Sequence, residues 1–321
     1  MKIPLSLAIN GYDHVRDLLE GHVEAEGIDI TALQLPIEEI FFRFTRFREW
    51  DASEMSFGKV VSILSQSNPD IVPIPVFPSR VFRHSAIYVA KGSALRKPKD
   101  LEGRRVGVPE WAQTAGIYCR GLLQHEYGVD LARIKWYRAG VHQAGRIEKV
   151  ELKLPKGVEL TAVPDRTLSQ MLHSGELDAV MSARHIEGAS RLFEDYPSAE
   201  LAYWKKTRIF PIMHVVVLRK DVYERDPWIA ANLLKAFEAA KQRSLARVAE
   251  MALSHVPVPW VPDHVERWRE SADADFWPYG VEANRPTLDA FLQYAFEQGV
   301  CHRKLSLDEL FARETRERFK I

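Results

Sequence analysis

Side chains that bind anions or carry protons gather in six short clusters along the chain. Three of them contain histidine, at residues 78–84, 184–185 and 211–214, and the first two also contain arginine. Arginine can hold a carboxylate through paired hydrogen bonds, and histidine exchanges protons near neutral pH. The other clusters, at residues 53–56, 110–114 and 277–280, offer hydroxyl, carboxylate, amide and aromatic groups. These residue types favour a site that binds a small anion and moves protons.

The segment 104–128 has the pattern of a buried strand that leads directly into a helix. A β-branched run at 106–108 is ended by Pro109, and apolar residues then recur at helical spacing, at Ala115, Cys119, Leu122 and Leu123. Gln113 and Thr114 fall in the first turn of that helix, where unpaired backbone N–H groups and the helix dipole favour an anion. The same residues also fit a capped helix start that binds nothing, so this segment alone leaves both interpretations open.

The elements that must position these clusters alternate between strand-like and helix-like runs, which is typical of βα units in a largely parallel sheet. Expected strands lie at residues 5–9, 28–33, 50–55, 86–90, 106–108, 134–137, 158–163, 177–184 and 211–218. Helices are expected at 15–25, around 40–47, after 114, after 168, and from 229 onward. The prolines at 69, 73, 75 and 78 predict an irregular connection. Each of these clusters lies at the end of a predicted strand, which is where open parallel sheets bind ligands.

Composition indicates an ordinary globular protein without a strong net charge. The 321 residues, 46% of them hydrophobic, can bury a large core, and this length favours two lobes. Because 44 basic residues balance 44 acidic ones, neither nucleic acid nor a membrane is an expected partner. Two cysteines cannot form a disulfide framework, and the amino terminus has no signal-peptide pattern. Both features predict a cytoplasmic location.

Motifs of several common enzyme classes are missing from the sequence. It contains no Gly-x-Gly-x-x-Gly, no P-loop, no His-Glu-x-x-His, no nucleophile elbow and no paired-cysteine zinc motif. The eleven histidines are scattered, so their spacing neither supports nor excludes a metal site.

Four stretches together resemble the 4,5-dihydroxyphthalate decarboxylase family. They read Asp-Ala-Ser-Glu-Met-Ser at 51–56, Phe-Pro-Ser-Arg-Val-Phe-Arg-His-Ser-Ala-Ile-Tyr-Val at 77–89, Gly-Val-Pro-Glu-Trp-Ala-Gln-Thr-Ala-Gly at 107–116, and Trp-Pro-Tyr-Gly-Val-Glu-Ala-Asn-Arg at 277–285. The resemblance spans nearly the whole chain. It is less specific about the substrate, because relatives in this family are often labelled as transport binding proteins.

The resemblance implies a two-lobed fold like that of type II periplasmic binding proteins. Each α/β lobe would be a mostly parallel sheet flanked by helices, with the ligand in the cleft between the lobes. We expect residues 1–90 and 208–321 to form a discontinuous first lobe and residues 91–207 to form the second. The crossovers between lobes then lie near 91–103 and 205–211.

The implied reaction is the non-oxidative decarboxylation of 4,5-dihydroxyphthalate, or a closely related hydroxylated aromatic dicarboxylate, to 3,4-dihydroxybenzoate and CO₂. Direct loss of CO₂ would leave an aryl carbanion that the ring cannot delocalise, so protonation of the ring carbon must come first. A base that removes the para hydroxyl proton enriches that carbon in electrons, an acid protonates it, and CO₂ then leaves. The site must therefore supply a base, an acid and cations for the retained carboxylate, without clamping the departing one.

Candidates for these roles come from the clusters. The catalytic candidates share a side chain that can carry a proton: His84, His214 and Glu54. The substrate-binding candidates share a positive charge or a hydrogen-bonding group: Ser53, Ser56, Arg80, Arg83, Gln113, Thr114, Arg184 and Tyr279. Of these, Arg80 and Arg83 would hold a carboxylate, and Tyr279 or Arg184 would donate to a phenolate. Each candidate also has a structural interpretation, as an ion pair or as a satisfied core residue.

Two other functions remain open at this point. One is a solute-binding protein or sensor for an aromatic carboxylate without catalysis, and the other is a cytoplasmic ligand-sensing or pyrimidine-precursor protein of the same superfamily. No cofactor is expected, although a divalent metal chelated by catechol oxygens is an open alternative, because histidine and glutamate are available. The expected partner is a small aromatic dicarboxylate, and a homo-oligomer is compatible with the sequence.

Overall fold

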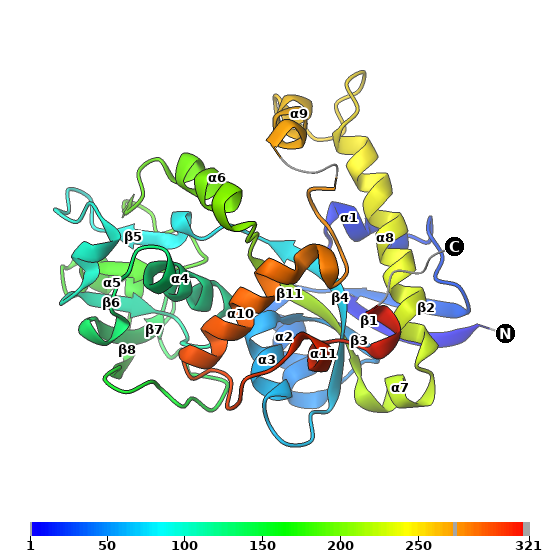
Figure 1. Ribbon diagram of the computed structural model, residues 1–321, viewed down its shortest axis with the longest axis horizontal. Coiled ribbons are helices and arrows are strands. Elements are labelled where there is room, and N and C mark those ends of the chain that lie inside the picture. Colours follow the sequence, from blue (N-terminus) through cyan, green and yellow to red (C-terminus); the bar gives the residue numbers. More distant parts are fainter. Residues whose placement is uncertain (1, 272–274, 317–321) are drawn as a thin grey trace.

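The computed structural model describes residues 2–271 and 275–316 and builds them around two sheets (Figure 1). The first sheet has the order β2-β1-β3-β11-β4. Its strands are β1 (Ile3–Ile9), β2 (Ile28–Gln34), β3 (Ala52–Ser56), β4 (Ile71–Arg80) and β11 (Ile212–Arg219). The second sheet has the order β10-β5-β9-β6-β7-β8. Its strands are β5 (Ile87–Val89), β6 (Arg105–Val108), β7 (Lys135–Gly140), β8 (Leu160–Thr167), β9 (Ala179–Met181) and β10 (Ser190–Arg191).

Helices surround both sheets, and one helix, α10 (Arg285–Glu297), contacts both lobes. The helices are α1 (Asp13–Leu19), α2 (Ile37–Phe47), α3 (Phe57–Leu64), α4 (Thr114–His125), α5 (Leu168–His173), α6 (Tyr196–Thr207), α7 (Lys220–Arg225), α8 (Trp228–Val248), α9 (Val261–Ser271), α10 (Arg285–Glu297) and α11 (Leu307–Leu310). Helix α10 lies between the lobes in Figure 1. Its Phe291 stacks on Phe57 of α3 and on Tyr118 of α4, so one aromatic group joins the two lobes.

The expected two-lobed α/β architecture is confirmed, and both sheets are mixed. β1 pairs in parallel with β2 and β3, and β6 pairs in parallel with β7 and β9. β11 runs antiparallel between β3 and β4, and β5 runs antiparallel to β9. β5 is the first strand after the chain crosses to the second sheet, and β11 is the first strand after it returns to the first sheet. Both therefore enter their sheet antiparallel to a neighbouring strand.

The proline-rich stretch is a strand, and its prediction as an irregular connection is wrong. Pro73, Pro75 and Pro78 all lie in β4, which is at the edge of the first sheet and pairs only with β11. Proline lacks an N–H group and is tolerated on an edge strand, where one side of the backbone needs no partner. The Pro75 carbonyl oxygen even accepts a hydrogen bond from Gly280 N, which ties the carboxy-terminal region to this edge.

The first crossover lies earlier than predicted. Strand β5 belongs to the second sheet, through pairing with β9 and β10, so a boundary at residue 90 would cut it from its own sheet. The chain instead crosses between the end of β4 at Arg80 and the start of β5 at Ile87, through a short 3₁₀ turn at His84–Ala86. Sequence pattern identified the strand but could not show which sheet it joins.

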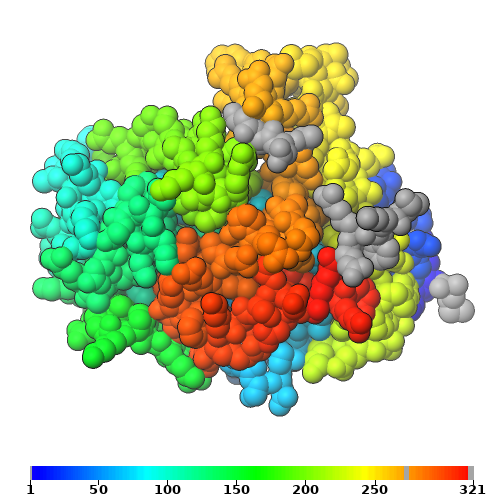
Figure 2. Space-filling model, in the orientation of Figure 1, coloured from blue at the N-terminus to red at the C-terminus, as the bar shows by residue number. Residues whose placement is uncertain are grey.

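A projecting arm stands out from the body of the molecule (Figure 2). It contains the end of α8, the following loop and α9, and it exposes large apolar side chains at Met251, Leu253, Val258 and Trp260. In the described part of the chain, no helix combines the length and the apolar character needed to cross a membrane.

Candidate active site

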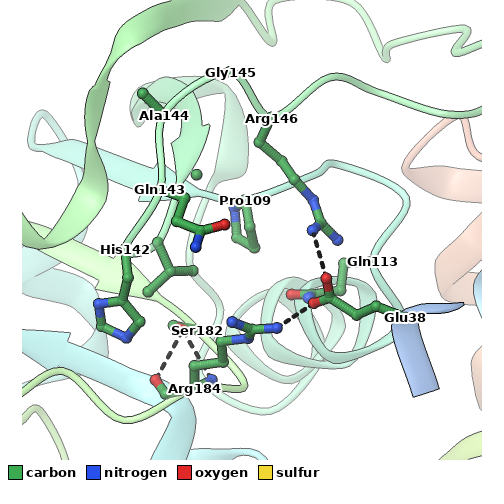
Figure 3. A pocket seen from close by; sticks show the side chains of 12 residues that line it. Glu38, Pro109, Gln113, His142, Gln143, Ala144, Gly145, Arg146, Ser182 and Arg184 are labelled. Atoms are coloured by element: carbon green, nitrogen blue, oxygen red, sulfur yellow. Dashed lines mark hydrogen bonds and ion pairs between the residues drawn. The ribbon is translucent and has the colours of Figure 1, made fainter. Parts of the chain in front are cut away.

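A cavity of about 260 Å³ opens between the two lobes. Helices α2 and α3 and strand β11 line it from the first lobe, while the start of α4 and the segments that follow β7 and β9 line it from the second. A smaller pocket of about 160 Å³ adjoins it and shares Glu38, Gln113, Arg146 and Arg184 (Figure 3). The ligand cleft expected from the resemblance is therefore present.

His214, which lines this cavity, belongs to a hydrogen-bonded group of three side chains that extends behind the lining. His214 on β11 places Nδ1 2.6 Å from Oε1 of Glu54 on β3. Tyr12, which follows β1, donates its hydroxyl to the same carboxylate oxygen at 2.6 Å. Glu54 is fully buried and also accepts the Asn10 backbone N–H at 3.0 Å. The sheet order, with β3 between β1 and β11, is what brings these three residues together.

This arrangement defines which atoms can exchange protons. A carboxylate so close to Nδ1 makes that nitrogen the protonated one in neutral histidine, so Nε2 is the nitrogen available to a ligand. Burial and the Glu54 carboxylate raise the pKa of Tyr12, which therefore stays a hydrogen-bond donor. Glu54 and Tyr12 together fix the orientation of the His214 imidazole, which lines the cavity.

Two cations line the cavity as well. Arg83 is partly buried, desolvation lowers its pKa, and its guanidinium contacts the Met213 sulfur rather than a carboxylate. Lys59 is 5% exposed, and its Nζ lies 3.9 Å from the nearest Glu110 carboxylate oxygen. Burial lowers the pKa of Lys59 to about 8, although the Glu110 charge acts in the opposite direction. Both side chains offer positive charge to an anionic ligand.

The start of α4 closes the cavity from the second lobe. Thr114 Oγ1 lies 2.9 Å from Ser56 Oγ and accepts the Gly58 backbone N–H at 2.9 Å, so it links α4 to the β3–α3 junction. Gln113 precedes the helix and lines the cavity. The unpaired N–H groups of a helix's first turn add positive potential at this position.

Ion pairs cross the cleft beside the cavity. Glu38 on α2 pairs with Arg184 and lies 3.6 Å from Arg146, both in the second lobe (Figure 3). Arg146 also pairs with Glu110 at 2.6 Å. The two contacts of Glu38 connect the lobes at the cavity, and the Arg146–Glu110 pair lies within the second lobe.

Most of the predicted site residues meet at this cavity or directly behind it. They are Glu54, Ser56, Arg83, Gln113, Thr114, Arg184 and His214. The hypothesis that polar clusters at strand ends share one cleft thus agrees with the geometry for these residues, whereas their individual roles stay predictions.

Arg80 and His84 lie elsewhere, contrary to the predicted placement. Arg80 donates to the Phe210 and Pro278 carbonyl oxygens and to Asn284 Oδ1, and burial lowers its pKa to about 10. It thus holds the carboxy-terminal region against β4. His84 is 1% exposed in a group of aromatic rings, and burial lowers its pKa to about 4. The rings are those of Tyr127, Phe193 and Tyr203.

Ser53 and Tyr279 are also absent from the cavity lining. Ser53 is buried within β3 and donates to the Glu54 carbonyl oxygen. Tyr279 is buried beside Phe77, with the Lys241 ammonium 4.8 Å from its ring centre. Neighbouring side chains of a strand point to opposite faces of the sheet, so the residues of one polar cluster do not all lie in the same site.

Sequence reasoning missed several residues of the site. Tyr12 follows the first strand and could have been found by the same strand-end rule that selected the other clusters. Lys59 is the only charged residue in the buried helix α3, and a charged residue in such a helix is itself a signal. Glu38 and Arg146 carry no local signal, because their importance arises from contact between the lobes.

A metal site was left open by the sequence. Within residues 2–271 and 275–316, no group of three or more His, Cys, Asp or Glu side chains is arranged to hold a metal ion.

Solved structures of low sequence identity share this fold. The aliphatic sulphonate binding protein SsuA of Escherichia coli matches with a TM-score of 0.54 at 14% identity, covering 98% of this chain and 99% of that one. The desulfurization enzyme DszB matches at 0.50 and 14% identity, covering 97% and 96%. A Candida albicans protein, the CA3427 gene product, described as having the generic periplasmic binding protein fold, matches at 0.50 and 11% identity, covering 100% and 98%. The chain is therefore of the periplasmic-binding-protein-like class.

Curated relatives narrow this class to a family. A 4,5-dihydroxyphthalate decarboxylase of Comamonas testosteroni is 38% identical over 328 residues, covering 100% of this chain and 99% of the relative. Another of that name, from Pseudomonas putida, is 40% identical over 185 residues, covering 57% and 71%. No family model matches the chain. The chain belongs to the 4,5-dihydroxyphthalate decarboxylase family and is an enzyme of the lyase class.

Proposed function

We propose that this chain catalyses the non-oxidative decarboxylation of a dihydroxylated aromatic dicarboxylate, with 4,5-dihydroxyphthalate as the substrate and 3,4-dihydroxybenzoate and CO₂ as products. The observation that carries the proposal is that His214, backed by Glu54, shares one cavity with the cation Arg83. A base and an anion-binding group in one cavity are what this substrate requires. In this proposal the reaction is a step of phthalate degradation, within aromatic catabolism.

Substrate binding begins with the carboxylate that stays on the ring. Arg83 makes contact with a thioether, which is a weak acceptor, so a carboxylate is a better partner for its N–H groups. The start of α4, with Gln113 and Thr114, supplies a second position for negative charge. A cavity of about 260 Å³ suits a compound with a single ring.

Catalysis begins at the hydroxyl para to the departing carboxylate. His214 Nε2 takes the phenolic proton, and Glu54 stabilises the imidazolium that forms. Tyr12 donates to the same Glu54 oxygen, which fixes the orientation of the carboxylate toward the imidazole. The electron density released moves through the ring to the carbon that bears the carboxylate, which is then protonated before CO₂ leaves.

Incubation of the purified protein with 4,5-dihydroxyphthalate tests this function. Chromatography should show equimolar 3,4-dihydroxybenzoate, and in deuterated water the product should carry one deuterium at the carbon that lost CO₂. Binding without turnover would instead support the alternative of a solute-binding protein or sensor. A parallel incubation with a chelator, followed by addition of a divalent ion, tests whether a metal takes part.

A further inference from the structure

Ring protonation needs two proton carriers in one cavity, a base for the hydroxyl and an acid for the ring carbon. His214 supplies one of them. His84, the other histidine that the sequence suggested, is enclosed by aromatic rings and does not line the cavity. A second group must therefore be found among the side chains that do.

Lys59 has the position that this role requires. In the β3–β11 ladder His214 lies opposite Ser56, and Lys59 follows three residues later on the first turn of α3. Lys59 and His214 both line the cavity. They are far apart in the sequence and come together because β11 pairs with β3, the strand that leads into α3. Lys59 is the only charged residue of the buried helix α3, and an ammonium there lowers stability and gains no packing that a methionine would not give.

The charged groups around Lys59 come mainly from the second lobe. Glu110, after β6, is the nearest carboxylate, and Arg146, Glu148 and Lys149 lie in the segment that follows β7. From the first lobe, the Phe41 ring of α2 faces the ammonium at 5.9 Å. Glu110 is already paired with Arg146 at 2.6 Å, which weakens its hold on Lys59.

These surroundings suit a proton donor better than a permanent cation. Burial outweighs the attraction of Glu110 and lowers the pKa of the Lys59 ammonium to about 8, so it is charged at neutral pH and still releases its proton readily. General acids work best when their pKa lies near the operating pH. Arg83, by contrast, cannot release a proton in this range.

We propose that Lys59 is the general acid that protonates the ring carbon bearing the departing carboxylate, while His214 acts on the hydroxyl. This inference rests on the proposed decarboxylase function and deepens it.

The proposed sequence of steps balances. His214 removes the hydroxyl proton, and the electron pair of that O–H bond moves through the ring to form a bond between the ring carbon and a proton from Lys59. The bond from this carbon to the carboxylate then breaks, its electron pair restores the aromatic phenolate, and CO₂ leaves. His214 returns its proton to the phenolate and neutral Lys59 takes one from water, so the net reaction consumes one proton and releases one CO₂.

The decisive variant is Lys59→Arg, because arginine keeps the positive charge but holds its proton. We expect turnover of 4,5-dihydroxyphthalate to fall about 100-fold or more, the usual scale of general acid catalysis, with ligand affinity nearly unchanged. Lys59→Met should lose turnover to a similar degree. Lys149→Met is the matched control, since it removes an ammonium 3.8 Å from the same Glu110 carboxylate but outside the cavity lining, and it should turn over normally.

A chemical rescue separates proton donation from fold or charge effects. Lys59→Cys treated with bromoethylamine rebuilds an ammonium of lower intrinsic pKa at this position. Position 59 lines the cavity and is therefore within reach of the reagent, whereas Cys119 and Cys301 are buried outside the cavity lining. Burial raises the pKa values of these two thiols to about 11 and about 12, so they resist alkylation. Turnover should return, and the alkaline limb of the pH profile should move to lower pH than in the wild type.

The outcomes distinguish this inference from the function on which it rests. A wild-type protein that does not turn over the substrate overturns the proposed function and the inference together. If the wild type is active and folded Lys59→Arg keeps its turnover, the lysine is only a cation and the inference alone is wrong. The inference is also wrong if the alkaline limb of the pH–rate profile does not shift after the chemical rescue of Lys59→Cys.

Discussion

At the scale of single residues, the hydrogen bond to the buried Glu54 carboxylate orients His214, the base of the proposed reaction. We expect His214→Gln to lose about 100-fold or more in turnover while binding is retained, because glutamine cannot take the phenolic proton. Steady-state kinetics and calorimetry on the same preparation measure both effects. His84→Gln is the matched comparison, and a larger loss of turnover there than at position 214 would contradict this assignment.

Arg83 permits a second test at this scale. Arg83→Ala should weaken binding of the dicarboxylate by about 2 to 5 kcal/mol, the cost of losing a charge-assisted pair in a closed cleft. A catechol without carboxylates should bind with nearly unchanged affinity, and it therefore serves as the internal control. Equal losses for the two ligands in isothermal titration calorimetry would show that Arg83 acts on the structure of the cleft instead.

At the scale of elements, the short turn His84–Ala86 carries the chain from β4 in one sheet to β5 in the other. His84 is enclosed there, and burial lowers its pKa from 6.5 to about 4. Between pH 6.5 and about 4, the His84 imidazole is protonated in the unfolded chain but stays neutral in the folded chain. The free energy of unfolding therefore decreases as the pH falls, by about 3 kcal/mol once the pH is below both pKa values. We therefore expect the folded chain to lose stability in acid.

The measurement is the free energy of unfolding of His84→Phe and of the wild type at neutral and at mildly acidic pH. We expect the variant to lose less stability on acidification, because phenylalanine fits among the surrounding rings and has no proton to take up. His255→Gln changes an exposed histidine and should behave like the wild type. His14, whose pKa burial likewise lowers to about 4, contributes in the same direction and remains in every variant. Parallel acid sensitivity of His84→Phe and wild type would contradict the prediction.

At the scale of the whole molecule, the ion pairs of Glu38 with Arg184 and Arg146 connect the two lobes across the cleft. These side chains are partly exposed, so each pair contributes about 0.2 to 1 kcal/mol and less at high salt. Glu38→Gln should therefore raise KM by a few fold, with little change in kcat, and small-angle scattering should show a more open molecule. Glu39→Gln is the control, because Glu39 pairs with Arg43 of the same helix. Equal kinetics for both variants would show that the pairs do not favour closure.

Two properties of the whole molecule stay predictions. The cytoplasmic location is tested by cell fractionation, and the homo-oligomer is tested by sedimentation velocity. The exposed apolar residues of the projecting arm, such as Trp260, make the second measurement of interest.

The sequence alone determined the local elements and the family resemblance. Periodicity located the strands at 5–9 and 106–108 and the helix that follows Thr114, because burial of one face leaves a repeating apolar pattern. The strand-end rule selected His214, Glu54 and Arg83, because it needs only the position of a polar residue relative to a predicted strand, which is a local property of the sequence. The prolines of β4, such as Pro75, led to the wrong prediction of an irregular connection. A local pattern cannot show that a segment is an edge strand, where proline is tolerated, because edge and central strands differ only in their neighbours.

Only the tertiary structure decided which of these residues meet. β3 lies between β1 and β11, and this order joins Tyr12, Glu54 and His214 across more than two hundred residues of sequence. The contact between lobes places Lys59 beside Glu110. Sheet order and lobe contact are long-range properties, to which each residue contributes only through its partners, so no local pattern in the chain records them.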